Sequence, residues 1–211
     1  MSVPHLGTKH SAAHRAIVRD NAEFLSDKLF LEFGVFVGSS LVGFSNLYRE
    51  YIPTYTKKLH GFDSFGGLPE FTKEDRNDPW HQGEFDHGGV VPADLMTDRF
   101  SIHKGWFSDT LTDEFAATLE GEKIGLLHVD CDIYSSTCQV LEFCFKHDLF
   151  TQGSIIVYDD WGGYQLTKFG PLEVGEGLAH TEMMRKYSRT CISKNTYQIS
   201  HGHEIAVFSI T

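Results

Sequence analysis

The chain has 211 residues, 41% of them hydrophobic and 22% charged, and no break in composition, which suits one compact domain spanning residues 1–211. The formal net charge of −11 and the lack of a basic run argue against nucleic acid as a partner. No apolar run reaches the roughly 18 residues that cross a bilayer, and the amino terminus lacks the pattern of a secretion signal, so we expect a cytoplasmic protein without a membrane partner.

Helices and strands are predicted to alternate along most of the chain. In chain order, the expected elements are helix 11–25, strand 29–35, helix 39–51, strand 58–63, strand 101–107, helix 110–119, strand 124–129, helix 136–149, strand 154–158, helix 176–187, and the strands 190–196 and 197–211. This alternation is typical of an α/β fold with a doubly wound, mostly parallel sheet, to which the last pair would add an antiparallel edge strand. Ligands of such sheets bind at the carboxyl ends of the strands.

Residues 66–91 interrupt the alternation. They are polar, show little periodicity and form a stretch too long for an ordinary connection. We expect this 66–91 segment to act as a lid. It is rich in acidic residues, which suit either a neutral or cationic polar acceptor or a solvated loop, and these include Glu70, Glu74, Asp75 and Asp78.

The first predicted strand runs into a glycine-containing string, from Glu32 to Ser40. Glycines let the backbone approach a ligand closely, and the amides of the next helix can face an anionic group such as a carboxylate. Asp63 closes the second strand, where nucleoside-binding sheets place a carboxylate on the ribose hydroxyls. The G-x-G-x-x-G pattern of dinucleotide sites is missing from this string. Together these features predict a nucleoside ligand.

Aspartates stand at the ends of the fourth and fifth predicted strands, as Asp130 with Asp132 and as the pair Asp159 and Asp160. If the two strands are neighbours, three or four carboxyl groups converge on one rim, where they repel one another unless a cation or shared protons neutralise them. Oxygen-only ligands suit a hard ion such as Mg²⁺. For Asp132 we favour another role, a cap on the helix that begins near Ser136.

Twelve histidines are scattered along the chain. His201 and His203 would share one face of a strand, but no third ligand is in view, so we expect no zinc site there. We interpret His128, two residues before Asp130, as a core histidine.

With these strings in place, the chain resembles the macrocin O-methyltransferase-like family, metal-dependent and S-adenosylmethionine-dependent enzymes that methylate sugar hydroxyls of antibiotics. Four blocks within about residues 29–161 carry the resemblance: Leu31–Val35, Gly61–Pro69, Gly105–Leu111 and His128–Thr137. The family usually has tyrosine where this chain has Trp161. The resemblance implies the class I methyltransferase fold, a Rossmann-like, doubly wound sheet of seven mostly parallel strands with an antiparallel edge strand.

The resemblance also implies site residues. Those implied at the methyl donor are Glu32, Gly34, Phe36, Ser40, Asp63, Ser64, Trp106, Phe107 and Asp130. Within this set, Glu32, Gly34 and Ser40 would shape the pocket for the methionine half, Asp63 would take the ribose, and Trp106 with Phe107 would flank the adenine. The implied ligands of a divalent metal, Mg²⁺, are Asp130, Asp159 and Asp160, with Asp130 also the general base.

The expected reaction is direct methyl transfer to a hydroxyl of a small molecule, a sugar of a glycosylated natural product. One alternative is a metal-independent methyltransferase with a histidine base, for which His128, His81 and His87 are candidates. Others are a non-catalytic nucleoside-binding protein and an NAD-dependent oxidoreductase, against which the missing dinucleotide motif counts. The sequence leaves open whether the protein forms a homo-oligomer.

Overall fold

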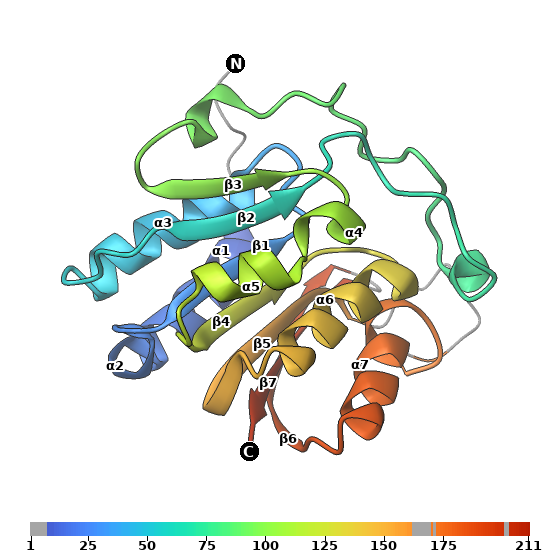
Figure 1. Ribbon diagram of the computed structural model, residues 1–211. Helices are drawn as coiled ribbons and strands as arrows, with labels where there is room; N and C mark the ends of the chain where they lie inside the picture. Colours follow the sequence, from blue (N-terminus) through green and yellow to red (C-terminus); the bar gives the residue numbers. More distant parts are fainter. Residues whose placement is uncertain (1–7, 162–169, 171, 201–202) are drawn as a thin grey trace.

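The computed structural model describes residues 8–161, 170, 172–200 and 203–211, which form one α/β sandwich around a seven-stranded sheet (Figure 1). The strands are β1 (Leu29–Phe33), β2 (Leu59–Asp63), β3 (Phe100–Lys104), β4 (Ile124–Val129), β5 (Phe150–Trp161), β6 (Cys191–Ser200) and β7 (His203–Ile210). Their order across the sheet is β3-β2-β1-β4-β5-β7-β6. The first five strands pair in parallel, whereas β7 is antiparallel to both β5 and β6. The antiparallel strand therefore lies one position inside the edge.

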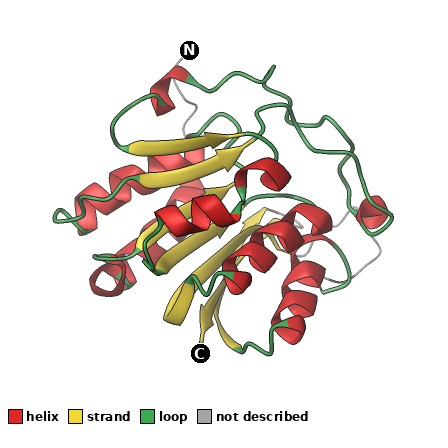
Figure 2. Cartoon of the chain, viewed as in Figure 1, coloured by secondary structure: helices red, strands yellow, loops and turns green. Residues whose placement is uncertain are grey.

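Helices cover both faces of the sheet (Figure 2). They are α1 (Thr8–Asp20), α2 (Ala22–Leu25), α3 (Ser39–Tyr51), α4 (Phe107–Thr110), α5 (Asp113–Thr118), α6 (Tyr134–Lys146) and α7 (Gly175–Lys186), with 3₁₀ turns η1 (Asp75–Asn77) and η2 (Ala93–Leu95). None of the helices in the described part of the chain has the length and apolar content to cross a bilayer.

Strand alternation divides the interior into two cores. In β1, Leu31 and Phe33 pack with residues of α6 and α7, whereas Phe30 packs with residues of α1 and α3. The same rule holds in β5, where Ile156 faces α6 and α7 and Val157 faces α1 and α3. We call these sides the α6/α7 face and the α1/α3 face.

The observed elements follow the predicted order, with shifts where turn chemistry decides the boundary. The predicted helix 11–25 is two helices, because the chain turns at Asn21, whose side-chain amide donates to the carbonyl of Ile17 at 2.7 Å. The predicted helix 110–119 is α5, which begins only at Asp113 because Thr112 caps it by accepting from the N–H of Phe115 at 3.1 Å. The predicted strand 101–107 ends at Lys104, and α4 begins at Phe107. The penultimate strand continues to Ser200 rather than ending at 196.

Candidate active site

A pocket of about 640 Å³ opens at the carboxyl ends of β1, β2, β4 and β5. The turn after β3 and the 66–91 segment complete its wall. The described residues that line it include Gly34, Phe36, Asp63, Ser64, Glu70, Trp80, Phe85, Trp106, Phe107, Asp130, Asp132, Asp159 and Asp160. The strand order reverses between β1 and β4, which is where open α/β sheets bind ligands, and the volume suits a small organic molecule.

The floor of the pocket depends on a close backbone approach between β1 and β4. Gly34 has φ +87°, and a β carbon at this position would lie 1.7 Å from the carbonyl oxygen of Asp130. The N–H of Asp130 donates to the carbonyl of Phe33 at 2.8 Å, which holds the two strand ends together. Only glycine fits here, as expected from the first motif.

Asp63 lies in the pocket wall and also builds the turn after β1. Its carboxylate accepts the backbone N–H groups of Val35 and Phe36, both at 2.7 Å, and of Phe65 at 2.6 Å. Phe36 and Phe65 have φ values of 47° and 55°, so these bonds hold two residues in a region that side chains rarely adopt. The position agrees with the expected ribose site, and contact with a ribose stays a prediction.

Aromatic side chains stand at the opening. Trp106 is 42% exposed although it lines the pocket, and Phe107 packs edge-on against Phe33 at 5.5 Å between ring centroids. Ser64 also lines the pocket and donates to the carbonyl of Gly67 at 3.2 Å. An exposed indole beside a concave surface can stack on a flat ring such as adenine.

Glu32 and Ser40 lie outside the residues that line the pocket. Ser40 Oγ donates to Glu32 Oε1 at 2.8 Å, and Glu32 Oε2 is 3.3 Å from His128 Nδ1. Burial raises the pKa of Glu32 above its usual value, against the opposing effect of His128. This placement points to a supporting role beneath the floor rather than direct contact with the methionine half of a donor.

Three carboxylates form what we call the acidic cluster: Asp130, Asp132 and Asp160, with oxygen atoms within 4.8 Å of one another. Burial, followed by the neighbouring carboxylates, raises the pKa of Asp130 and of Asp132 well above the usual range and that of Asp160 to about 6. Such a cluster can hold a hard cation.

The expectation that Asp132 caps α6 is wrong. The helix begins at Tyr134, and Asp132 has φ 64°, which turns its side chain toward Asp160. The caps come from the 66–91 segment instead: Asp78 accepts from the N–H of Tyr134 at 3.1 Å and Asp75 from that of Ser135 at 2.8 Å. These two acids are buried and anchor the segment to α6, so they do not face an acceptor.

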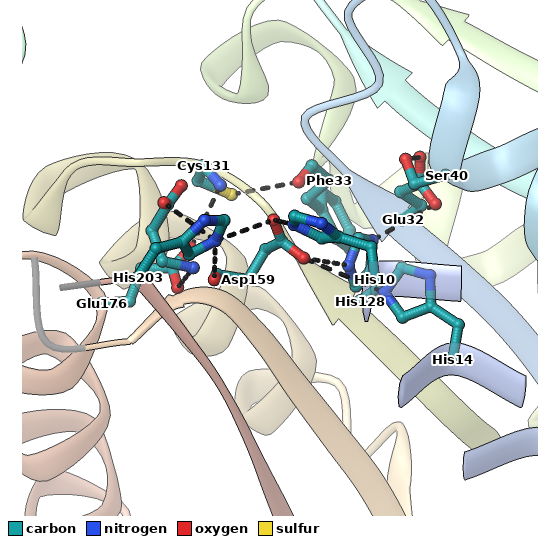
Figure 3. Close-up of polar contacts among 11 residues, drawn as sticks. His10, His14, Glu32, Phe33, Ser40, His128, Cys131, Asp159, Glu176 and His203 are labelled. Atoms are coloured by element: carbon teal, nitrogen blue, oxygen red, sulfur yellow. Dashed lines mark hydrogen bonds and ion pairs between the residues drawn. The ribbon is translucent and has the colours of Figure 1, made fainter. Parts of the chain in front are cut away.

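Asp159 and Asp160 diverge although they are consecutive. Both belong to β5, which continues to Trp161, so their side chains point to opposite faces of the sheet. Asp160 joins the acidic cluster, whereas Asp159 extends to the α1/α3 face, among His10, His128 and other histidines (Figure 3). The structure thus does not bring the expected ligand set of Asp130, Asp159 and Asp160 together as one cluster.

Comparison with known proteins identifies the chain. A family model described as Macrocin-O-methyltransferase (TylF) matches residues 12–169, which is well over half of the chain. The chain belongs to the macrocin O-methyltransferase family. It is thus an S-adenosylmethionine-dependent O-methyltransferase. A comparison with curated protein sequences finds no match.

Solved structures that resemble this O-methyltransferase share its fold. CalS11, a calicheamicin methyltransferase, is 23% identical with a TM-score of 0.66, over 94% of this chain and 77% of that chain. The O-methyltransferase NovP is 19% identical with a TM-score of 0.71, over 100% and 83% of the two chains. An O-methyltransferase from Bacillus cereus in complex with SAH is 13% identical with a TM-score of 0.52, over 99% and 84%. The fold is that of class I methyltransferases.

One residue important to the methyltransferase site was not anticipated. Glu176, at the start of α7, is 1% exposed, and its carboxylate accepts the backbone N–H groups of Cys131 at 3.2 Å and Asp160 at 3.1 Å. Burial, with Asp160 and Asp159 nearby, raises its pKa well above the usual value. Glu176 therefore links the end of β5 to Cys131, just after the end of β4, next to the acidic cluster. An acidic residue between two glycines, Gly175 and Gly177, was the available signal.

Proposed function

We propose that this O-methyltransferase methylates a sugar hydroxyl of a small-molecule glycoside and that the acidic cluster binds a divalent metal ion, such as Mg²⁺, for that reaction. The observation that carries the proposal is the convergence of Asp130, Asp132 and Asp160 on the wall of a pocket with a glycine floor and an exposed indole. CalS11, which shares the fold, is described as a TDP-rhamnose 3'-O-methyltransferase of calicheamicin biosynthesis.

The residues present fit a hard cation. The cluster offers oxygen atoms only, and the raised pKa values of Asp130 and Asp132 reflect carboxylates that burial and mutual repulsion disfavour as anions. Asp132 replaces Asp159 in the ligand set inferred from the family. A divalent ion bound there supplies a Lewis acid and a template for the acceptor hydroxyl, and S-adenosylmethionine supplies the electrophilic methyl group.

Side chains of the protein would have three further roles in the reaction: proton removal, positioning of the backbone and exclusion of water. Asp130 lines the pocket at the end of β4 and is the candidate base for the proton of the acceptor hydroxyl. Glu176 fixes the backbone on both sides of the cluster. Trp80 and Phe85, 5.1 Å apart between ring centroids, bring apolar surface from the 66–91 segment to the pocket, where it would exclude water from the reacting groups. We retain the expectation that this segment serves as a lid.

The metal-independent alternative lacks a positioned base. Among the described residues that line the pocket there is no histidine. His128 is fully buried beneath the floor, and His81 is an exposed partner of Glu84, with 3.0 Å between Nδ1 and Oε2. His87 lies edge-on to Phe36, 6.1 Å away between ring centroids, and does not line the pocket. The placement of these candidates favours the metal-assisted reaction.

The test is methyl transfer from S-adenosylmethionine to a panel of nucleotide-linked and free glycosides, with simple catechols as comparison acceptors. We expect transfer to a glycoside, loss of about 100-fold or more in rate after EDTA treatment, as for the loss of a preorganised electrostatic group, and recovery with Mg²⁺. Asp132→Asn should lose activity while binding S-adenosylhomocysteine normally, and the exposed Asp113→Asn should not. Full turnover in EDTA would refute the metal, and turnover of catechols alone would refute the glycoside.

A further inference from the structure

Five side chains meet at the rim of the α1/α3 face, above the same strand ends but on the other side of the sheet from α6 and α7 (Figure 3). They come from α1, β4, β5 and β7, and we call them the histidine–Asp159 cluster: His10, His14, His128, Asp159 and His203. His128, Asp159 and His203 lie on strands, where residues two positions apart point to the same face. Each of them therefore points to the α1/α3 face, as does the apolar residue two positions away.

The two oxygens of Asp159 each meet two histidines. Oδ2 is 3.5 Å from His10 Nε2 and 3.6 Å from His203 Nε2. Oδ1 is 3.5 Å from His128 Nε2 and 3.9 Å from His14 Nε2. These separations exceed ordinary hydrogen bonds, but His203 Nε2 also donates to the carbonyl oxygen of Asp159 at 2.9 Å, a bond that it would give up on ligating a metal. The separations from the Asp159 carboxylate are close to the roughly 3.4 Å between ligand atoms of a tetrahedral ion with bonds of about 2.0–2.1 Å.

Buried polar atoms of the cluster lack hydrogen-bond partners. Both ring nitrogens of His14 are buried without one, and the nearest partners of the two His128 nitrogens are only long contacts, with Glu32 Oε2 at 3.3 Å and Asp159 Oδ1 at 3.5 Å. His14 is fully buried and stacked on Phe44 at 4.3 Å between ring centroids, an apolar setting that disfavours a charged ring, and a neutral ring has a lone pair that can bind a metal. Neutral imidazole is the form of histidine that ligates.

The surroundings also suit a metal-binding histidine. His128 directs Nε2 toward Asp159 and Nδ1 toward Glu32 Oε2, at 3.3 Å. A ligating histidine commonly donates its other N–H to a carboxylate, which fixes the ring. Glu32 is thus placed to orient the His128 ring so that Nε2 faces Asp159.

We propose that the histidine–Asp159 cluster binds one transition-metal ion of the Zn²⁺ class, with Asp159 as the ligand shared by its two histidine pairs. The site adjoins the acidic cluster, since His203 Nε2 also lies 3.8 Å from Asp160 Oδ1. Mixed imidazole and carboxylate ligands select such ions over Mg²⁺. The partly exposed His10, whose side chain is 19% exposed, provides the side from which the ion enters. The ion would tie α1 to β4, β5 and β7, and the proposal holds whether or not the acidic cluster binds Mg²⁺.

The test uses the full-length protein, stripped with a chelator and kept in excess Mg²⁺ so that oxygen-only sites are occupied. Zn²⁺ is titrated by calorimetry, and Co²⁺ by the visible absorption that reports nitrogen ligands and low coordination. We expect one Zn²⁺ per chain. His10→Ala and His203→Ala should each weaken binding by about tenfold or more. Circular dichroism confirms folding, since His10 is partly exposed and the buried His203 is 9% exposed.

Two control variants locate the ion. His81→Ala removes a histidine whose side chain is 79% exposed, and Asp132→Asn alters the acidic cluster, so both should bind Zn²⁺ as the wild type does. The proposal is overturned if the wild type binds no Zn²⁺, if His81→Ala weakens binding as much as His10→Ala, or if Asp132→Asn abolishes binding. Anomalous diffraction at the zinc edge should place the ion beside Asp159, and a peak in the acidic cluster instead would also overturn it.

Discussion

Gly34 and Asp130 approach each other so closely that a β carbon on the glycine would lie 1.7 Å from the aspartate's carbonyl oxygen. This contact places the candidate base at the end of β4 directly beside the glycine turn that follows β1. The same backbone contact therefore shapes the floor of the pocket and positions the candidate base.

Gly34→Ala should be strongly destabilising, because it combines this clash with a φ of +87°. We expect the free energy of unfolding in urea to fall by more than about 2 kcal/mol. Gly121→Ala is the matched control, since Gly121 has φ +79° but no atom within 4 Å of the added carbon, and it should lose about 1 kcal/mol. Equal losses in both variants would show that backbone strain alone, and not the contact with Asp130, limits position 34.

Asp75→Ala should loosen the 66–91 segment and the start of α6 together. The Asp75 carboxylate accepts from the N–H of Ser135 and, through its other oxygen, from the N–H and hydroxyl of Thr72. We expect a loss of about 1–2 kcal/mol in unfolding free energy and faster amide exchange in the segment. Glu74→Ala, at the adjacent residue, which is exposed and lies 3.3 Å from Lys73, should behave as the wild type. Unchanged exchange in Asp75→Ala would contradict the anchoring role.

Asp78 gives a pH dependence of defined sign. Burial raises its pKa to about 6, against the opposing bond from the N–H of Tyr134. The folded state thus favours the protonated acid, and this contribution to stability is present below pH 4 and lost as the pH rises through 6. Asp78→Asn should remove that loss and be more stable than the wild type at pH 7.5 by on the order of 1–3 kcal/mol, with no difference from this source below pH 4. Chemical denaturation at several pH values measures it, and a variant less stable at pH 7.5 would refute the sign.

Trp106→Ala should weaken donor binding without unfolding the protein. The indole is 42% exposed at the pocket opening, so its removal costs little core packing. Loss of an aromatic contact worth about 0.5–1.5 kcal/mol would raise the Kd for S-adenosylhomocysteine about 2- to 12-fold in calorimetry. Met96→Ala, at a residue 71% exposed and outside the pocket lining, is the control. Unaltered affinity in Trp106→Ala would remove the indole from the donor site.

The sequence predicted the carboxyl ends of β2 and β4 correctly, because each is a buried apolar run that stops at an aspartate, Asp63 or Asp130, whereas β1 and β3 end earlier and β5 later than predicted. The role of Gly34, which is to allow a close approach of the backbone, was also predicted from the sequence. The sequence did not predict which carboxylates would meet. Once β5 extends through Trp161, alternation favours opposite sides for Asp159 and Asp160, a signal that the shorter predicted strand concealed. The register shift between Tyr158 and Trp161 could not be read from the sequence.

Other parts of the site depend on contacts between distant residues. The caps of α6 come from Asp75 and Asp78, about 60 residues earlier, and no local pattern near Tyr134 indicates them. The partners of Asp159 include His10 and His203, at opposite ends of the chain. A spacing of four between His10 and His14, on one face of a helix, was the only local hint in α1. His201, considered with His203 in the sequence, lies outside the described residues.

The position of β7 has a consequence for how the protein is made. Because β7 inserts between β5 and β6, the full length of β5 has no partner on that side until residues 203–210 have been synthesised. During translation, β1 to β5 can pair while the unpaired edge of β5, with its apolar Ile155 and Val157, stays open to other chains. Nascent chains should therefore depend on chaperones until their last strand leaves the ribosome.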